Sequence, residues 1–274
     1  MIYVGIDPSL ESTALFIFDS ESHTYEYHSF FVTHDGKLQR KRQRVIDELS
    51  DAGINVHIFV DNVDRSKVKH AKLRSDSNTK KQADAVCVAI KDILQSGSSL
   101  DDLSEVLDSA HKDDLEVYQL MAENDLSRFS NMKSVSLEVR ETIISFCKKL
   151  NKNEVVIAIE APAYVASGSS GSSSVDLIAG CAFIRDVPNT LLEDGVTVNN
   201  TYMLPPTSVK KHATGRGTAT KEEMCEAFTR KGPNDAFREL VSTVATKDYK
   251  PMDDIVDAYF MAYFVAEDIL SMLS

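Results

Sequence analysis

Short apolar blocks separated by polar turns open the chain. Residues 2–7 alternate in polarity, residues 13–19 are almost continuously apolar, and residues 24–32 are rich in aromatic and β-branched side chains. Short connections between such blocks predict three antiparallel strands. The first strand ends in a carboxylate, Asp7, and a Pro-Ser turn follows at once. A turn residue and a catalytic residue are both consistent with Asp7, so its interpretation depends on partners elsewhere in the chain.

Helical and strand patterns alternate over the remaining sequence. They predict helices at 37–50, 80–95, 131–150, 175–190, 221–230 and 252–272, two short acidic helices within 100–125, and strands at 55–61, 154–160 and 197–204. Strands interleaved with helices favour an α/β fold, in which a mixed β-sheet is flanked by helices. We expect one domain over residues 1–274, interrupted by a mainly helical insertion over residues 33–130.

Composition limits the class of protein. A hydrophobic fraction of 43% in 274 residues is enough for a sizeable core. The four cysteines are scattered without a CxxC pair, which indicates buried thiols in a reducing compartment and no zinc site. No run of 18 apolar residues and no leader-like amino terminus is visible, so we expect a cytoplasmic protein without a membrane span.

The net charge of −12 is unevenly distributed. Residues 100–125 are strongly acidic, whereas residues 37–44 and 65–74 are basic, and residues 195–221 contain lysine and arginine but no acid. Each basic run is explained by a solvated surface. Local basic faces on an acidic protein also bind phosphates, so the net charge does not exclude a nucleic-acid partner.

Carboxylates stand at the ends of predicted elements. Asp7 ends the first strand, Glu160 ends a buried strand, and the last helix opens with Asp253, Asp254 and, one turn later, Asp257. Acids at a helix start also complement the helix dipole, but Glu160 would be costly to bury without a partner. If these elements meet in one cleft, the oxygens suit Mg²⁺ or Mn²⁺, and two such ions can drive phosphodiester hydrolysis.

Four short motifs occur in the order that is typical of one protein family. They are Gly5-Ile6-Asp7-Pro8-Ser9, Ile157-Ala158-Ile159-Glu160, the segment from Val209 to Lys221 (VKKHATGRGTATK), and Asp254-Ile255-Val256-Asp257-Ala258. Together they resemble RuvC-type Holliday junction resolvases, which belong to the RNase H-like nuclease superfamily. The resemblance covers residues 1–32 and about 130–274.

The resemblance implies an RNase H-like mixed sheet and a crossover junction endodeoxyribonuclease, active in DNA recombination and repair. It implies that two Mg²⁺ ions, for which Mn²⁺ can substitute, are bound by Asp7, Glu160, Asp254 and Asp257, with Asp253 as an ambiguous neighbour. Lys221 would stabilise developing charge at the scissile phosphate. DNA contacts are expected from Lys210, Lys211, Arg216 and Tyr164, and from the basic-run residues Arg40, Lys41, Arg42, Lys69 and Lys72. The partner would be branched double-stranded DNA, bound by a homodimer.

The chain departs from the family in several ways. It is larger and more acidic, and the insertion has no counterpart that aligns. The wedge aromatic expected after the central strand has only Tyr164 as a candidate, at a different spacing and followed by Ser and Gly. A large divergent resolvase suggests a viral origin, which would place the protein in a host cytoplasm.

Other interpretations stay open. An RNase H-like nuclease could act on other branched DNA or on an RNA–DNA hybrid, because the fold does not fix the substrate. An ASKHA-type ATPase or kinase also begins with Gly-Ile-Asp and has Ser12-Thr13 nearby, but its second, glycine-rich phosphate loop is missing after Glu160. A non-catalytic DNA-binding relic is disfavoured by the intact carboxylates.

Overall fold

The computed structural model describes residues 1–9, 12–34, 39–61, 88, 90–93, 95–96, 115–161, 181–243 and 251–273. The chain divides into two compact units. The first, which we call the sheet unit, comprises Met1–Thr33, Lys37–Phe59 and Met132–Ser274, and the second comprises His34–Gly36 and Val60–Asn131. About half of the predicted insertion over 33–130 lies outside the described residues, so the insertion stays a prediction.

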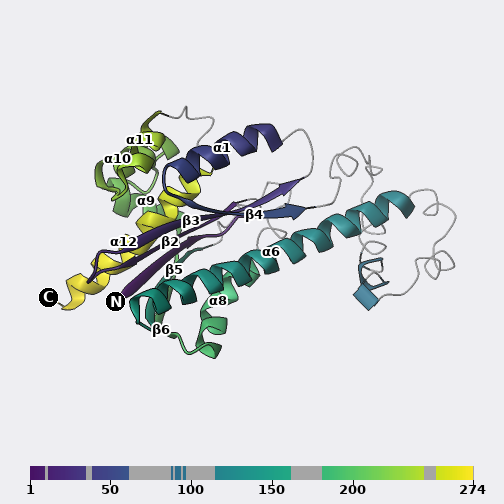
Figure 1. The fold of residues 1–274 in the computed structure, drawn as a ribbon, viewed down its shortest axis with the longest axis horizontal. Coiled ribbons are helices and arrows are strands. Elements are labelled where there is room, and N and C mark those ends of the chain that lie inside the picture. The colour runs from purple at the N-terminus through teal and green to yellow at the C-terminus, as the bar shows by residue number, and fades with distance from the viewer. Residues whose placement is uncertain are drawn as a thin grey trace. The chain divides into compact units, whose positions relative to one another are not determined.

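A six-stranded mixed sheet forms the centre of the sheet unit (Figure 1). Its strands are β1 (Ile2–Asp7), β2 (Ser12–Asp19), β3 (Tyr25–His34), β4 (Asn55–Asp61), β5 (Glu154–Glu160) and β6 (Thr197–Leu204), in the order β4-β3-β2-β1-β5-β6. The first three pair antiparallel, whereas β1, β5 and β6 run parallel. All six predicted strands are therefore confirmed, and so is the predicted α/β fold class, a mixed sheet flanked by helices.

Helices cover both faces of this sheet. The helices are α1 (Gln39–Asp51), α6 (Leu115–Leu150), α8 (Ala182–Glu193), α9 (Pro206–Thr214), α10 (Lys221–Lys231), α11 (Asp235–Thr243) and α12 (Met252–Leu273). One face packs against α12, α1 and the helices α9 to α11. The other packs against α8 and the carboxyl-terminal part of α6 (Figure 1). Among the described residues, none of these helices has the length and apolarity needed to cross a membrane.

Strand alternation assigns each side chain of β1 to one face. Tyr3 packs with the α12 core, whereas Ile2, Val4 and Ile6 pack with the α6–α8 core. Side chains two residues apart share a face, so Gly5 and Asp7 lie on the α12 side. A Cβ on Gly5 would stand 1.9 Å from the carbonyl oxygen of Ala258 and 2.8 Å from the amide nitrogen of Ala262. Glycine is therefore required here because the backbone of α12 rests directly on β1.

Some helices differ from the sequence prediction. Helix α6 begins at Leu115, well before the predicted start at 131. Helix α9 was not predicted, because Pro205-Pro206 reads as a strand breaker; Pro206 in fact occupies the first turn, where proline is well tolerated. Helix α11 was also missed. The described cysteines Cys147, Cys181 and Cys225 are buried and free, in agreement with the prediction.

A chain of four titratable side chains links β3, β4 and α6. Glu26 Oε2 lies 3.2 Å from His28 Nε2, and His28 Nδ1 lies 3.1 Å from His57 Nε2. His57 Nδ1 completes the chain at 3.3 Å from Glu138 Oε1. Each ring nitrogen that faces a carboxylate must donate, and one of the two nitrogens that face each other must donate. Full protonation of both rings would place two donors and two positive charges face to face, so the contacts disfavour that state.

We expect this row of two glutamates and two histidines to make the stability of the protein depend on pH. Burial, and then the neighbouring His28, lower the pKa of His57. Below the ordinary histidine pKa of about 6.5 the unfolded state then binds more protons than the folded state, so this contribution to stability falls as pH falls. His57→Gln is expected to flatten the loss of stability between pH 7 and pH 5, measured as urea midpoints. The exposed-residue control His23→Asn should keep the wild-type slope, and an unchanged slope in His57→Gln would contradict the assignment.

Candidate metal and nucleic-acid site

Parallel strand ends bring Asp7 and Glu160 together. Strand β1 pairs with β5 in a register that runs from Ile2 opposite Val155 to Ile6 opposite Ile159. The next pair in this register is Asp7 and Glu160. Both side chains lie on the α12 face, since Val156 and Ala158 of β5 belong to that core. The carboxyl ends of adjacent parallel strands are a common place for ligand sites in α/β proteins.

Helix α12 brings Asp254 over the same strand end. Ala258 contacts Gly5, and α12 runs antiparallel to β1 (Figure 1). Asp254 precedes Ala258 by four helical residues, about 6 Å along the axis. Asp7 follows Gly5 by two strand residues, about 6.6 Å in the same direction. The close contact of α12 with Gly5 therefore sets the position along β1 at which the carboxylates of the helix lie beside those of the strands.

The carboxylates of Asp7, Glu160, Asp254 and Asp257 shift one another's pKa values. Burial raises the pKa of Asp7 well above its usual range, and the charges of Glu160, Asp254 and Asp257, together with a hydrogen bond to Glu160, raise it further. Burial is also the largest cause that raises the pKa of Asp257, and the charges of Glu160, Asp254 and Asp253 raise it further. The charge of Lys210 lowers the pKa of Asp257. The predicted residues Asp7, Glu160, Asp254 and Asp257 are thus brought together from β1, β5 and α12.

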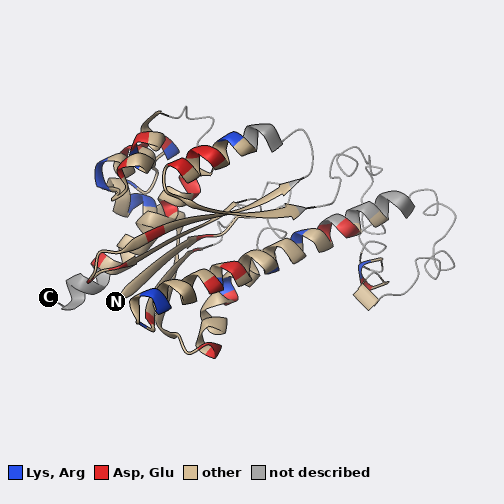
Figure 2. Ribbon diagram, viewed as in Figure 1, with Lys and Arg blue, Asp and Glu red and all other residues tan. Residues whose placement is uncertain are grey.

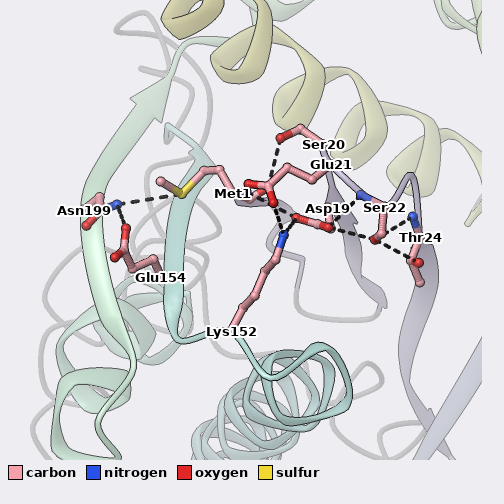
Figure 3. A network of polar contacts seen from close by, with 9 residues as sticks. All are labelled: Met1, Asp19, Ser20, Glu21, Ser22, Thr24, Lys152, Glu154 and Asn199. Carbon is pink, nitrogen blue, oxygen red and sulfur yellow. Dashed lines mark hydrogen bonds and ion pairs between the residues drawn. The ribbon is translucent and has the colours of Figure 1, made fainter.

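A buried acid at the opposite end of the β1–β2 strand pair provides a contrast (Figure 3). Asp19 ends β2 and is fully buried. It accepts hydrogen bonds from Lys152 at 2.7 Å and from the Ser22 hydroxyl at 2.7 Å. Burial opposes the ionised form, but these donors outweigh it and hold the pKa of Asp19 well below its usual range. Asp19 is therefore a structural acid surrounded by hydrogen-bond donors, whereas the neighbours that act most strongly on Asp7 are other carboxylates.

Ser12, which the sequence prediction of the site did not include, and Asp253, its ambiguous member, complete the cluster's surroundings. Ser12 begins β2 and its buried hydroxyl donates a hydrogen bond to Asp254 Oδ2. Alternation with Ala14 and Phe16 puts Ser12 on the α12 face, and this pattern was the signal available in the sequence. Asp253 forms an ion pair with Lys221, the first residue of α10.

Basic residues lie beside the acidic helix. Helix α9, which carries Lys210 and Lys211, packs against α12, which carries acids but no lysine or arginine (Figure 2). The motif resemblance predicts a DNA-contacting loop from Val209 to Lys221, but in the structure Lys210 and Lys211 belong to helix α9. Gly215, with φ of 83°, ends α9, and a capping box on Thr220 starts α10. Arg216 lies between the two helices and pairs with Glu223.

Several predicted DNA contacts are not described. Tyr164, Lys69 and Lys72 lie outside the described residues. The backbone of Arg40, Lys41 and Arg42 belongs to α1, but the positions of these side chains are not described.

The donor chemistry of the cluster fits a hard divalent cation, because all four ligand candidates offer carboxylate oxygens. The concentration of acidic charge is a second sign of fit, because the neighbouring carboxylates raise the pKa of Asp7 whereas hydrogen-bond donors lower that of Asp19. Within the part of the chain that the structure describes, no three His, Cys, Asp or Glu side chains converge closely enough to hold an ion. The carboxylates instead take part in hydrogen bonds: Ser12 donates to Asp254, and Asp7 and Glu160 are hydrogen-bonded to each other.

Comparison with known proteins gives distant likenesses only. No family model matches the chain, and no curated protein matches it. The structure is similar to RuvC from Thermus thermophilus, with 12% identity and a TM-score of 0.36 over 97% of this chain and 96% of that chain. It is also similar to T. thermophilus RuvC in complex with a Holliday junction substrate, with 12% identity and a TM-score of 0.37 over 97% of this chain and 94% of that chain. These likenesses are too distant to assign a family, so the function must rest on the chain's own side chains.

Proposed function

We propose that the chain is a Mg²⁺-dependent, structure-selective DNA endonuclease that resolves four-way junctions. The observation that carries the proposal is the meeting of Asp7, Glu160, Asp254 and Asp257 at the carboxyl ends of β1 and β5, in a sheet unit whose α9 and α10 supply lysines beside them. The choice of a four-way junction, and of a homodimer that nicks two symmetric strands, follows from the motif resemblance in the sequence.

The residues of the cluster would each have a defined task. Asp7 and Glu160 would exchange the hydrogen bond between them for shared ligation of the ions, with Asp254 and Asp257 closing the site from α12. Two bound Mg²⁺ ions would supply an activated water and neutralise charge on the phosphate, leaving 5′-phosphate and 3′-hydroxyl ends.

Lys221 would bring a positive charge to the reacting phosphate from the start of α10. Burial opposes its charged form, but the hydrogen bond and charge of Asp253, and then the charges of Asp254 and Asp257, raise the pKa of Lys221 above its usual value. The side chain therefore stays cationic at neutral pH. Lys210, Lys211 and Arg216 would bind neighbouring phosphates of the DNA backbone, in an otherwise acidic protein.

A cleavage assay on defined DNA tests this proposal. Purified protein with Mg²⁺ is expected to cut a four-way junction faster than a fork, a linear duplex or an RNA–DNA hybrid, and EDTA is expected to stop the reaction. Binding measured in Ca²⁺ should weaken as salt increases, because the contacts are made to phosphates. Faster cutting of the fork or the hybrid would redirect the proposal to another substrate, and cleavage that persists in EDTA would refute the metal mechanism.

A further inference from the structure

The last helix begins with two adjacent acids whose surroundings differ. Asp254 accepts a hydrogen bond from Ser12, and its charge acts on Asp7. Asp253 points to another element, since its Oδ2 pairs with the ammonium of Lys221 on α10. Consecutive helical residues are separated by about 100° around the axis, so the two side chains cannot both face β1.

The pair formed by Asp253 and Lys221 is asymmetric. The Asp253 side chain is 6% exposed, whereas the Lys221 side chain is 55% exposed. Oδ1 of Asp253 is buried and has no hydrogen-bond partner, so Lys221 is the main compensation for this carboxylate among the described residues. The carboxylate is the fixed member of the pair, and the lysine is the member that can reach solvent and a ligand.

Lys221 stands where a lysine is not favoured by its own helix. It is the first residue of α10, and the positive end of the helix dipole disfavours a cation there. The capping box between Thr220 and Glu223 fixes the backbone at this point. A fixed backbone and a buried carboxylate partner therefore hold the ammonium at the rim of the carboxylate cluster.

We infer that Asp253 is a positioning residue that holds Lys221 for the reaction, and that Asp254, not Asp253, is the ligand contributed by the start of α12. This inference rests on the proposed nuclease function. It assigns different tasks to two adjacent acids that the sequence alone could not separate. Asp253 contacts no ion and acts on the scissile phosphate through the lysine.

A double-mutant cycle tests whether Asp253 acts through Lys221. Asp253→Asn and Lys221→Ala are each expected to lower the single-turnover cleavage rate, by up to about a hundredfold, the cost of misplacing a catalytic group. The double variant should be no slower than the slower single variant, because both changes remove one interaction. Rates that fall multiplicatively would overturn the inference.

Dependence on Mg²⁺ separates a positioning residue from a ligand. In Asp253→Asn the Mg²⁺ concentration for half-maximal rate should stay at the wild-type value, whereas in Asp254→Asn it should rise at least several-fold. Glu226→Gln, which removes an exposed acid from α10, is the matched charge control and should change neither quantity. A raised Mg²⁺ requirement in Asp253→Asn would make Asp253 a ligand and refute the assignment.

A measurement without catalysis keeps the pairing testable if the nuclease proposal fails. Reductive methylation followed by mass spectrometry reports how readily each lysine reacts. In the wild type, Lys221 should react several-fold more slowly than the exposed Lys211. In Asp253→Asn, Lys221 should react about as fast as Lys211. Equal rates in the wild type would show that the pair does not form, whatever the enzyme does. Slow labelling in a protein that cuts no DNA would retain the pairing and refute the nuclease function.

Discussion

Asp7→Asn is expected to abolish junction cleavage and, without metal, to make the protein more stable at neutral pH. Removing one member of a catalytic unit typically costs about 10⁴-fold or more in rate, and Asp7 interacts electrostatically with the other three carboxylates. Junction binding in Ca²⁺ should change little, because Asp7 is buried and the proposed DNA contacts lie on α9 and α10.

The gain in stability follows from the sign of the pKa shift. Because the pKa of Asp7 is raised in the folded state, the folded protein binds more protons than the unfolded chain above the ordinary aspartate pKa. Stability is therefore lost as pH rises from about 4 through the folded-state pKa. Asparagine does not ionise, so the variant avoids this loss. We therefore expect Asp7→Asn to have a higher free energy of unfolding than the wild type at pH 7.5.

Urea unfolding in EDTA at pH 4 and pH 7.5 measures this effect. The advantage of Asp7→Asn should be present at pH 7.5 and small at pH 4, and Mg²⁺ should reduce it by stabilising the wild type. Asp47→Asn, on the exposed side of α1, is the control for removing one negative charge. A variant that is less stable than the wild type at pH 7.5 would show that Asp7 is a structural acid of the same kind as Asp19.

Gly5→Ala is expected to disable the site without altering any carboxylate. The added Cβ would stand 1.9 Å from the Ala258 carbonyl oxygen, and because that atom belongs to the backbone, α12 must move away from β1. Overpacking of this kind costs about 1–3 kcal/mol in free energy of unfolding. Asp254 and Asp257 move with the helix, so the Mg²⁺-dependent cleavage rate should fall by about a hundredfold even in the folded fraction.

Val4→Ala is the matched control for this change. Val4 neighbours Gly5 but packs against the α6–α8 core, so its truncation lowers stability by a similar order without displacing α12. Cleavage per folded molecule should remain near the wild-type value in Val4→Ala and fall in Gly5→Ala. Equal activity in the two folded variants would show that contact at Gly5 does not set the site geometry.

Strand patterning in the sequence predicted the sheet and the strand-end acids correctly. Apolar runs that end in Asp7 and Glu160 are local features, and their register follows once β1 and β5 pair in parallel. The tasks of Ser12 and Asp253 could not be predicted in the same way. Their partners, Asp254 and Lys221, come from other elements, and only the tertiary packing of α12 determines which acid meets which partner.

Helix α9 could not be predicted from the local sequence either. A proline pair ends a strand by removing backbone donors, but it also suits the first turn of a helix, and local sequence does not decide between these outcomes at α9. As a result, lysines expected on a loop stand on a helix that packs against α12. The roles of the predicted DNA-contacting residues stay predictions until binding is measured.

The two cores of the sheet have a practical consequence for engineering. The α12 core supports every carboxylate of the proposed site, whereas the α6–α8 core contacts β1 only through Ile2, Val4 and Ile6. Libraries that repack the α6–α8 side can therefore search for heat-resistant variants while the catalytic geometry is conserved. Libraries on the α12 side will mix folding defects with defects in chemistry, and screens for activity alone will not distinguish them.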